Sequence, residues 1–197
     1  MKTVLSIASY KGPDLICNQQ VQALLKEGVV QKEGVVQSAI YTVGISCVTL
    51  ARNVQISRAF AQCEPGDTIL LIDDDMIFPP DMVSDLIRKS TQYSEVVSAN
   101  YVDKDRKPCH AWRQGVTVSG LGCVAIPYVD LQRMACNYPQ FTNPTNAGET
   151  YWAFTECGVI DGEWWSEDHM LFLRLGGCLM FGSAGHRKEC VLWPETA

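Results

Sequence analysis

Three consecutive carboxylates, Asp73, Asp74 and Asp75, follow directly after the apolar run 69–72. A run of β-branched and aliphatic residues without polar alternation predicts a strand that is buried on both faces, as in parallel sheets. Like charges at the end of such a strand repel one another unless a positive group lies between them, and a hard divalent cation prefers oxygen ligands. Ligands of open α/β sheets bind at the carboxyl ends of strands. The triplet therefore predicts a metal site, with a simple polar loop after a core strand as the alternative.

The segments that must hold these aspartates alternate between strand and helix patterns. Strands are expected over residues 3–9, 38–43, 68–72 and 96–99, and helices over 15–26, 49–62 and 81–89. This alternation predicts a doubly wound α/β fold, in which a mixed, mostly parallel sheet is flanked by helices. A chain of 197 residues has the size of one such domain.

The second half of the chain is patterned differently. Residues 116–126 are apolar and contain two glycines, which predicts close packing against another backbone. Residues 137–150 are rich in Asn, Pro, Thr and Gly and are expected to form a loop. A last helix is expected after Ser166, followed by a strand over 178–181.

A short internal repeat interrupts the first half. The hexapeptide KEGVVQ occupies residues 26–31 and recurs at once over 32–37. Two copies of six residues are too few and too short for a solenoid, whereas surface connections tolerate such insertions. We interpret the repeat as a tandem duplication in the link between the first helix and the second strand, without chemistry of its own.

The net charge and the cysteine content limit the binding partners and the cellular locations that we expect. The formal net charge of -6 gives no broad attraction to nucleic acid or anionic membranes, although a local basic groove is compatible with it. No apolar stretch reaches the length of a membrane-spanning helix, and the N-terminal apolar segment is too short for a signal peptide. Nine cysteines are scattered without metal or redox spacing, which favours a reducing, cytoplasmic location.

Four separated signals then occur in a recognisable order. They are Ser9-Tyr10 after the first strand, Ala51-Arg52-Asn53 in a helix, the D-x-D of Asp73 to Asp75, and Trp165-Ser166-Glu167-Asp168 before a helix, with His186 further on. This order resembles the GT-A glycosyltransferases, especially the family-2-like group that uses nucleotide-diphosphate sugars. The resemblance extends from the first strand to His186. It implies a nucleotide-binding half over 1–100 and an acceptor and catalytic half over 101–197.

The resemblance assigns most of the early signals to the donor. It implies that Ser9 and Tyr10 contact the base, that Arg52 and Asn53 lie against base and ribose, and that Asp73 and Asp74 contact the nucleotide. Gly122 matches the glycine-containing strand that lines the donor sugar. The implied donor is a nucleotide-diphosphate sugar, with a UDP-sugar as the expected case.

The resemblance assigns the remaining signals to the metal and to the acceptor. Asp75 and His186 are implied ligands of Mn²⁺ or Mg²⁺, which neutralises the diphosphate leaving group. Asp168 matches the carboxylate that removes the proton of the acceptor hydroxyl in inverting members. Glu167, Trp164 and Trp165 are candidates for acceptor contacts. The acceptor itself stays open among a glycan, a lipid-linked sugar, a protein and a modified nucleic acid.

Structural explanations exist for the same residues. Ser166 is a sound helix N-cap, and acidic residues are favoured in a first helical turn, so Glu167 and Asp168 could serve the helix alone. His186 could be an ordinary surface histidine. Two other functions also remain: a nucleotide-sugar-binding module without turnover, and a phosphotransfer enzyme with an aspartate nucleophile. The large residues at 76–78 disfavour the latter.

Overall fold

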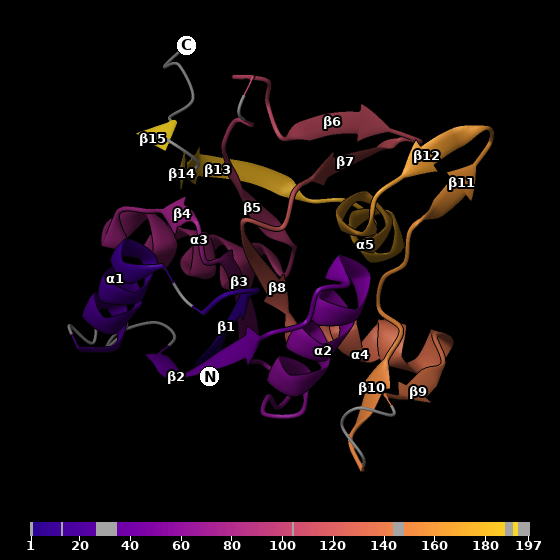
Figure 1. Ribbon diagram of the computed structural model, residues 1–197, viewed down its shortest axis with the longest axis horizontal. Coiled ribbons are helices and arrows are strands. Elements are labelled where there is room, and N and C mark those ends of the chain that lie inside the picture. Colours follow the sequence, from indigo (N-terminus) through magenta and orange to yellow (C-terminus); the bar gives the residue numbers. More distant parts are fainter. Residues whose placement is uncertain are drawn as a thin grey trace.

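The computed structural model (Figure 1) describes residues 2–12, 14–26, 35–103, 105–143, 148–187 and 191–192. The helices are α1 (Leu15–Lys26), α2 (Val48–Phe60), α3 (Pro80–Tyr93), α4 (Tyr128–Asn137) and α5 (Glu167–Leu175). The strands are β1 (Lys2–Ser9), β2 (Val35–Val43), β3 (Thr68–Asp73), β4 (Met76–Ile77), β5 (Val97–Asn100), β6 (His110–Arg113), β7 (Val116–Ser119), β8 (Cys123–Pro127), β9 (Gln140–Thr142), β10 (Thr150–Trp152), β11 (Gly158–Ile160), β12 (Glu163–Trp165), β13 (Leu179–Ser183), β14 (Gly185–Arg187) and β15 (Val191–Leu192).

A six-stranded sheet in the order β13-β5-β8-β3-β1-β2 forms the centre of the molecule. Neighbouring strands are parallel except at β8, which runs antiparallel to both β3 and β5. Helices α1 and α3 pack on one face of the sheet, and α2, α4 and α5 pack on the other (Figure 1). The expected α/β fold, with a mixed, mostly parallel sheet between helices, is therefore confirmed.

Strand β3 explains why the aspartates lie where they do. Its residues 69–72 are fully buried, and alternate side chains enter the two different cores, as expected for a strand covered on both faces. Asp73 is the last residue of β3. The chain then leaves the sheet for β4, which pairs with β14 instead.

Several elements differ from the expectation. Helix α4 was not predicted, although Leu131 and Met134 are buried at helical spacing. The expected loop over 137–150 contains β9, which pairs with β10 because Phe141 lies opposite Tyr151. Strand β2 begins at Val35, so it takes in the end of the second hexapeptide copy, while residues 27–34 lie outside the described part.

Two findings concern membrane insertion and the state of the cysteines. Within the described ranges, no helix combines the length and apolarity needed to cross a membrane. The eight cysteines in those ranges are free thiols, and Cys190 lies outside them. The cytoplasmic location stays a prediction, as does the division into halves at residue 100.

Candidate active site

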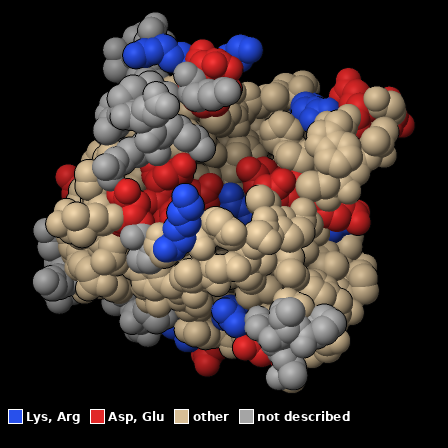
Figure 2. Space-filling view, viewed as in Figure 1, with Lys and Arg blue, Asp and Glu red and all other residues tan. Residues whose placement is uncertain are grey.

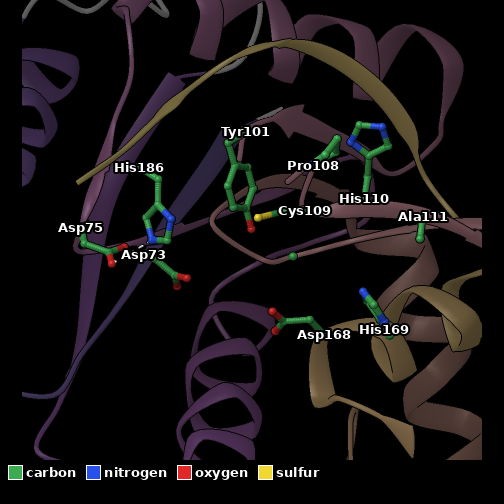
Figure 3. Close-up of a pocket in the computed structure, with 11 residues that line it drawn as sticks. Asp73, Asp75, Tyr101, Pro108, Cys109, His110, Ala111, Asp168, His169 and His186 are labelled. Atoms are coloured by element: carbon green, nitrogen blue, oxygen red, sulfur yellow. Dashed lines mark hydrogen bonds and ion pairs between the residues drawn. The ribbon is translucent and has the colours of Figure 1, made fainter. Parts of the chain in front are cut away.

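A cavity of about 390 Å³ lies beside the end of β3 (Figure 3). Eleven residues line it: Asp73, Asp75, Tyr101, Pro108, Cys109, His110, Ala111, Gly120, Asp168, His169 and His186. Asp75 and His186 lie at one end in Figure 3, and His110 and His169 lie at the other, with Asp168 between them. Four residues from three separate parts of the sequence, Asp73, Asp75, Asp168 and His186, therefore share one cavity.

Arg52 is the buried cation behind this cavity. Its guanidinium binds both carboxylate oxygens of Asp73, with Nη2 2.9 Å from Oδ2, and its Nε lies 3.6 Å from Oδ1 of Asp168. Burial disfavours the charge on Arg52, but Asp73 and Asp168 outweigh burial and raise the pKa of Arg52. Arg52 is held in place because the neighbouring Gln55 on α2 donates a hydrogen bond to the backbone of Ser6 on β1 (3.0 Å).

Asp168 has an unusual ionisation for a carboxylate. Burial raises its pKa to about 7, with Arg52 opposing the shift and Glu167 adding to it. Oδ2 of Asp168 accepts a long hydrogen bond of 3.4 Å from the backbone N–H of Leu121. A carboxylate whose pKa lies near neutrality can accept a proton and release it again, which is the property of a general base.

Strand pairing brings Asp75 and His186 together. His186 on β14 lies opposite Met76 on β4 in the antiparallel register, next to Asp75. Nε2 of His186 is 3.0 Å from Oδ2 of Asp75. A carboxylate and an imidazole are chemically suitable ligands for Mn²⁺, and a carboxylate for Mg²⁺.

The fit to a metal ion depends on ligands from outside the chain. Among the described residues, no group of three or more His, Cys, Asp or Glu side chains could hold an ion by themselves. Asp75 and His186 would supply two ligands. This pair fits an ion that takes its other ligands from a diphosphate and from water, as Mg²⁺ commonly does in phosphate-binding sites.

Tyr101 explains why glycines occupy positions 120 and 122 beside the cavity. Its hydroxyl accepts a hydrogen bond of 3.0 Å from the backbone N–H of Gly122. A Cβ at Gly120 would lie 2.1 Å from that hydroxyl, and a Cβ at Gly122 would lie 2.9 Å from the tyrosine ring. The expected close approach in this segment is therefore to a side chain as well as to a strand, and it forms one wall of the cavity.

The other donor candidates lie around the cavity without lining it. Ser9 is buried at the end of β1, and Tyr10 beyond it is exposed. Burial raises the pKa of Asp74, a shift that the side chain of Ser9 opposes and that the neighbouring aspartates increase. The side-chain amide of Asn53 is occupied on both sides by the backbone of Thr155, with two hydrogen bonds of 2.9 Å.

The acceptor candidates are divided between core and surface. Trp165 is fully buried, whereas Trp164 is 65% exposed on the β11–β12 hairpin. Trp165 therefore offers no face to an acceptor in this arrangement. Glu167 does not line the cavity, and its carboxylate lies 3.7 Å from the thiol of Cys157.

Two further residues, which the sequence did not indicate, belong to the far end of the site: His169 lines the cavity, and Arg113 contacts His169. His169 follows Asp168 directly on α5 and lines the same cavity. Arg113, at the end of β6, contacts Nδ1 of His169 at 3.1 Å. Only the position of His169 next to Asp168 could have indicated it, because the contact with Arg113 joins two distant segments.

Charge is unevenly distributed around the site. Figure 2 shows a band of acidic side chains across the middle of one face, between the region of α1 and β4 and the start of α5. Asp73, Asp75 and Asp168 face the cavity, and the buried cation at this point is Arg52. One guanidinium shared by several carboxylates leaves excess negative charge that attracts a cation.

Comparison with known proteins gives one informative match. No family model matches the chain, and no curated protein does. Among solved structures, the chain is similar to the crystal structure of A197 from STIV, with a TM-score of 0.57 and 14% sequence identity. The similarity covers 100% of this chain and 96% of that chain. At this identity the match establishes a shared fold over the whole length.

Proposed function

We propose that the chain is a metal-dependent glycosyltransferase, which moves a sugar from a nucleotide-diphosphate sugar, in the expected case a UDP-sugar, to an acceptor hydroxyl with inversion. One observation carries the proposal: a possible metal-binding pair, Asp75 and His186, shares a single cavity with Asp168, a carboxylate of raised pKa. The fold, with its ligand-binding edge at the end of β3, is consistent with this function.

The donor would bind at the Asp75 end of the cavity. Asp75 and His186 would hold Mn²⁺ or Mg²⁺, which neutralises the charge of a departing diphosphate. Asp73 lies between that end and Asp168, and its orientation is fixed because both of its oxygens bind Arg52. A fixed carboxylate at this point can accept hydrogen bonds from the hydroxyls of a ribose.

Asp168 would act as the general base. In an inverting transfer, the base must face the acceptor hydroxyl on the side of the sugar opposite the leaving group. Asp168 lies in the middle of the cavity, away from the end that holds Asp75 and His186 (Figure 3). Its pKa of about 7 suits a group that takes up a proton at neutral pH.

The two alternatives explain the contacts less well. An aspartate nucleophile must turn toward a phosphorus atom and keep its electron density, but Arg52 holds both oxygens of Asp73 and draws on their negative charge. A protein that only binds the nucleotide-sugar does not need a general base. The pKa of Asp168, raised by burial and further by Glu167 and Asp73, is therefore unexplained in a binding module without turnover. The Arg52–Asp73 hydrogen bonds and the raised pKa of Asp168 therefore favour the transferase over the two alternatives.

The direct test is a screen of UDP-, GDP-, ADP- and dTDP-sugars with and without MnCl₂. We expect one donor class to raise the melting temperature and to be hydrolysed slowly when Mn²⁺ is present. Saturation at 100 times Kd stabilises a protein by about 2.7 kcal/mol, which corresponds to roughly 5–10 °C for a chain of this size.

Three variants sharpen the screen. Asp75→Ala should abolish the dependence on Mn²⁺, whereas Asp168→Asn should keep donor binding and lose turnover. Asp85→Ala is the matched control, because Asp85 is an exposed carboxylate on α3 that pairs with the exposed Arg88. Metal-dependent donor binding that survives Asp75→Ala, or no donor binding at all, would contradict the proposal.

A further inference from the structure

We propose that His169 binds the acceptor by donating a hydrogen bond from Nε2 to a hydroxyl next to the one that Asp168 deprotonates, so that the acceptor is a carbohydrate with neighbouring hydroxyls. This inference rests on the function proposed above, because it places Asp168 as the base. It adds the chemical class of the acceptor and the residue that selects it.

The position of His169 is the first step. Asp168 and His169 are consecutive residues in the first turn of α5, and both line the cavity. In Figure 3 the imidazole points into the same space as the carboxylate. A molecule that brings a hydroxyl to Asp168 therefore lies within reach of His169.

The contact with Arg113 fixes the tautomer of His169. Nη1 of Arg113 is 3.1 Å from Nδ1 of His169. A guanidinium has only N–H donors and stays protonated, so Nδ1 must accept this hydrogen bond with its lone pair. The proton of a neutral imidazole is then on Nε2, the nitrogen that Arg113 does not contact, which makes that nitrogen a hydrogen-bond donor.

Arg113 is itself held from several sides. Its guanidinium lies 4.0 Å from the ring centre of Trp165, and Nη2 is 2.7 Å from Oε2 of Glu163. Both terminal nitrogens also lie 3.4 Å from the backbone oxygen of Trp164. These contacts give the buried Trp165 a role: it supports the arginine that orients His169.

The surroundings keep His169 neutral. Burial lowers the pKa of the imidazole, and the charge of Arg113 lowers it further, while Glu167 opposes the shift. A neutral imidazole with a protonated Nε2 does not compete with Asp168 for the acceptor proton. It can only donate a hydrogen bond in that direction.

A donor beside a base selects a particular kind of acceptor. Asp168 accepts the proton of the reacting hydroxyl, and His169 needs a second oxygen that accepts a hydrogen bond close by. Neighbouring hydroxyls of a sugar ring present this pair, whereas the single hydroxyl of a serine or threonine side chain satisfies Asp168 alone. A site that hydrogen-bonds a substrate hydroxyl rejects analogues that lack it.

The first experiment measures the tautomer by long-range ¹H–¹⁵N NMR on the full chain at pH 7.5, without any substrate. The chain contains three histidines, so the spectrum of His169→Gln assigns the signal. We expect a neutral ring with the proton on Nε2, and a loss of that preference in Arg113→Gln. A proton on Nδ1, or a charged ring at this pH, would overturn the proposal.

The second experiment measures transfer to methyl hexopyranosides, to their monodeoxy analogues and to an N-acetyl-serine amide, with the donor that the screen identifies. His169→Phe should raise the KM for the best glycoside about tenfold. His169→Gln keeps an N–H donor and should retain most of the affinity. With the wild-type chain, one monodeoxy analogue should show the same roughly tenfold rise in KM relative to the parent glycoside. With His169→Phe, that analogue and the parent glycoside should have the same KM.

The outcomes separate this inference from the proposed function. If no nucleotide-sugar is bound or hydrolysed, the transferase function fails. If transfer occurs but the serine amide is the better acceptor, or His169→Phe leaves the acceptor KM unchanged, the transferase stands and the role of His169 is refuted.

Discussion

Replacing Arg52 by Gln tests whether one buried cation holds the two carboxylates of the site. Arg52 binds Asp73 through two hydrogen bonds and lies 3.6 Å from Asp168. The substitution leaves both carboxylates without their positive partner. It should lower the free energy of unfolding, and the loss should depend on pH because Asp168 titrates near neutrality.

The magnitude follows from the burial of the three groups. Removing one partner of a buried ion pair costs about 3–5 kcal/mol. The side chains of Asp73 and Asp168 are 27% and 22% exposed, so water compensates part of the loss and the lower end, about 3 kcal/mol, applies at pH 8.5. At pH 5.5, Asp168 is protonated in both proteins, and the loss of charged hydrogen bonds at Asp73 leaves about 2 kcal/mol.

The assay is urea denaturation of both proteins at pH 5.5 and 8.5. Arg58→Gln is the matched control, because Arg58 lies on the same helix and also binds a carboxylate with two nitrogens, that of Glu149. That carboxylate is 50% exposed, so solvent screens the pair and the control should change stability little at either pH.

Two results would refute the reasoning. A loss for Arg52→Gln no larger than that for Arg58→Gln would mean that Arg52 does not neutralise the site. An equal loss at pH 5.5 and 8.5 would mean that Asp168 is not coupled to Arg52. If Arg52→Gln does not fold, Arg52→Lys retains the charge without the planar fork, so its loss should be smaller and should differ less between pH 5.5 and 8.5.

The remaining predictions concern the base and the walls of the cavity. Because only the carboxylate form of Asp168 accepts a proton and its pKa is about 7, transfer should rise roughly tenfold per pH unit below 7 and level off above; a flat profile would exclude it as base. Gly120→Ala puts a Cβ 2.1 Å from the Tyr101 hydroxyl and should cost about 1–3 kcal/mol in urea denaturation, a loss that Tyr101→Phe partly relieves. Trp165→Ala should cost about 3–5 kcal/mol, whereas Trp164→Ala, which is exposed, should stay within about 0.5 kcal/mol by the same assay.

The main helices and strands could be predicted from the sequence because the spacing of apolar residues shows which faces of each element are buried. The run 69–72 has no polar position, and the strand it forms is indeed covered on both faces. The helix expected over 15–26 forms as α1, and Asp14 directly before it accepts a hydrogen bond of 2.9 Å from the backbone N–H of Ile16. In contrast, α4 was missed because only two of its residues, Leu131 and Met134, are buried. Two buried positions in a short, largely polar segment do not establish a helical period.

The contents of the site were less predictable, because they depend on contacts between distant segments. The resemblance indicated Asp75 and His186, and their contact follows from the pairing of β4 with β14, which no local pattern encodes. Arg52 was expected against the nucleotide, yet its guanidinium faces two carboxylates from inside the protein. A helical pattern identifies the buried face of α2 but not the groups that meet it.

The position of Arg52 links the stability of the fold to the proposed chemistry. Asp73 ends a strand of the first half of the chain, and Asp168 begins a helix of the second half. Two carboxylates this close disfavour each other's ionisation unless a cation is shared between them. Arg52 offsets the burial of Asp168 and this repulsion only in part, since the pKa of Asp168 stays near 7. The incomplete compensation leaves Asp168 able to gain and lose a proton at neutral pH, whereas complete neutralisation would leave it a permanently charged, weak base.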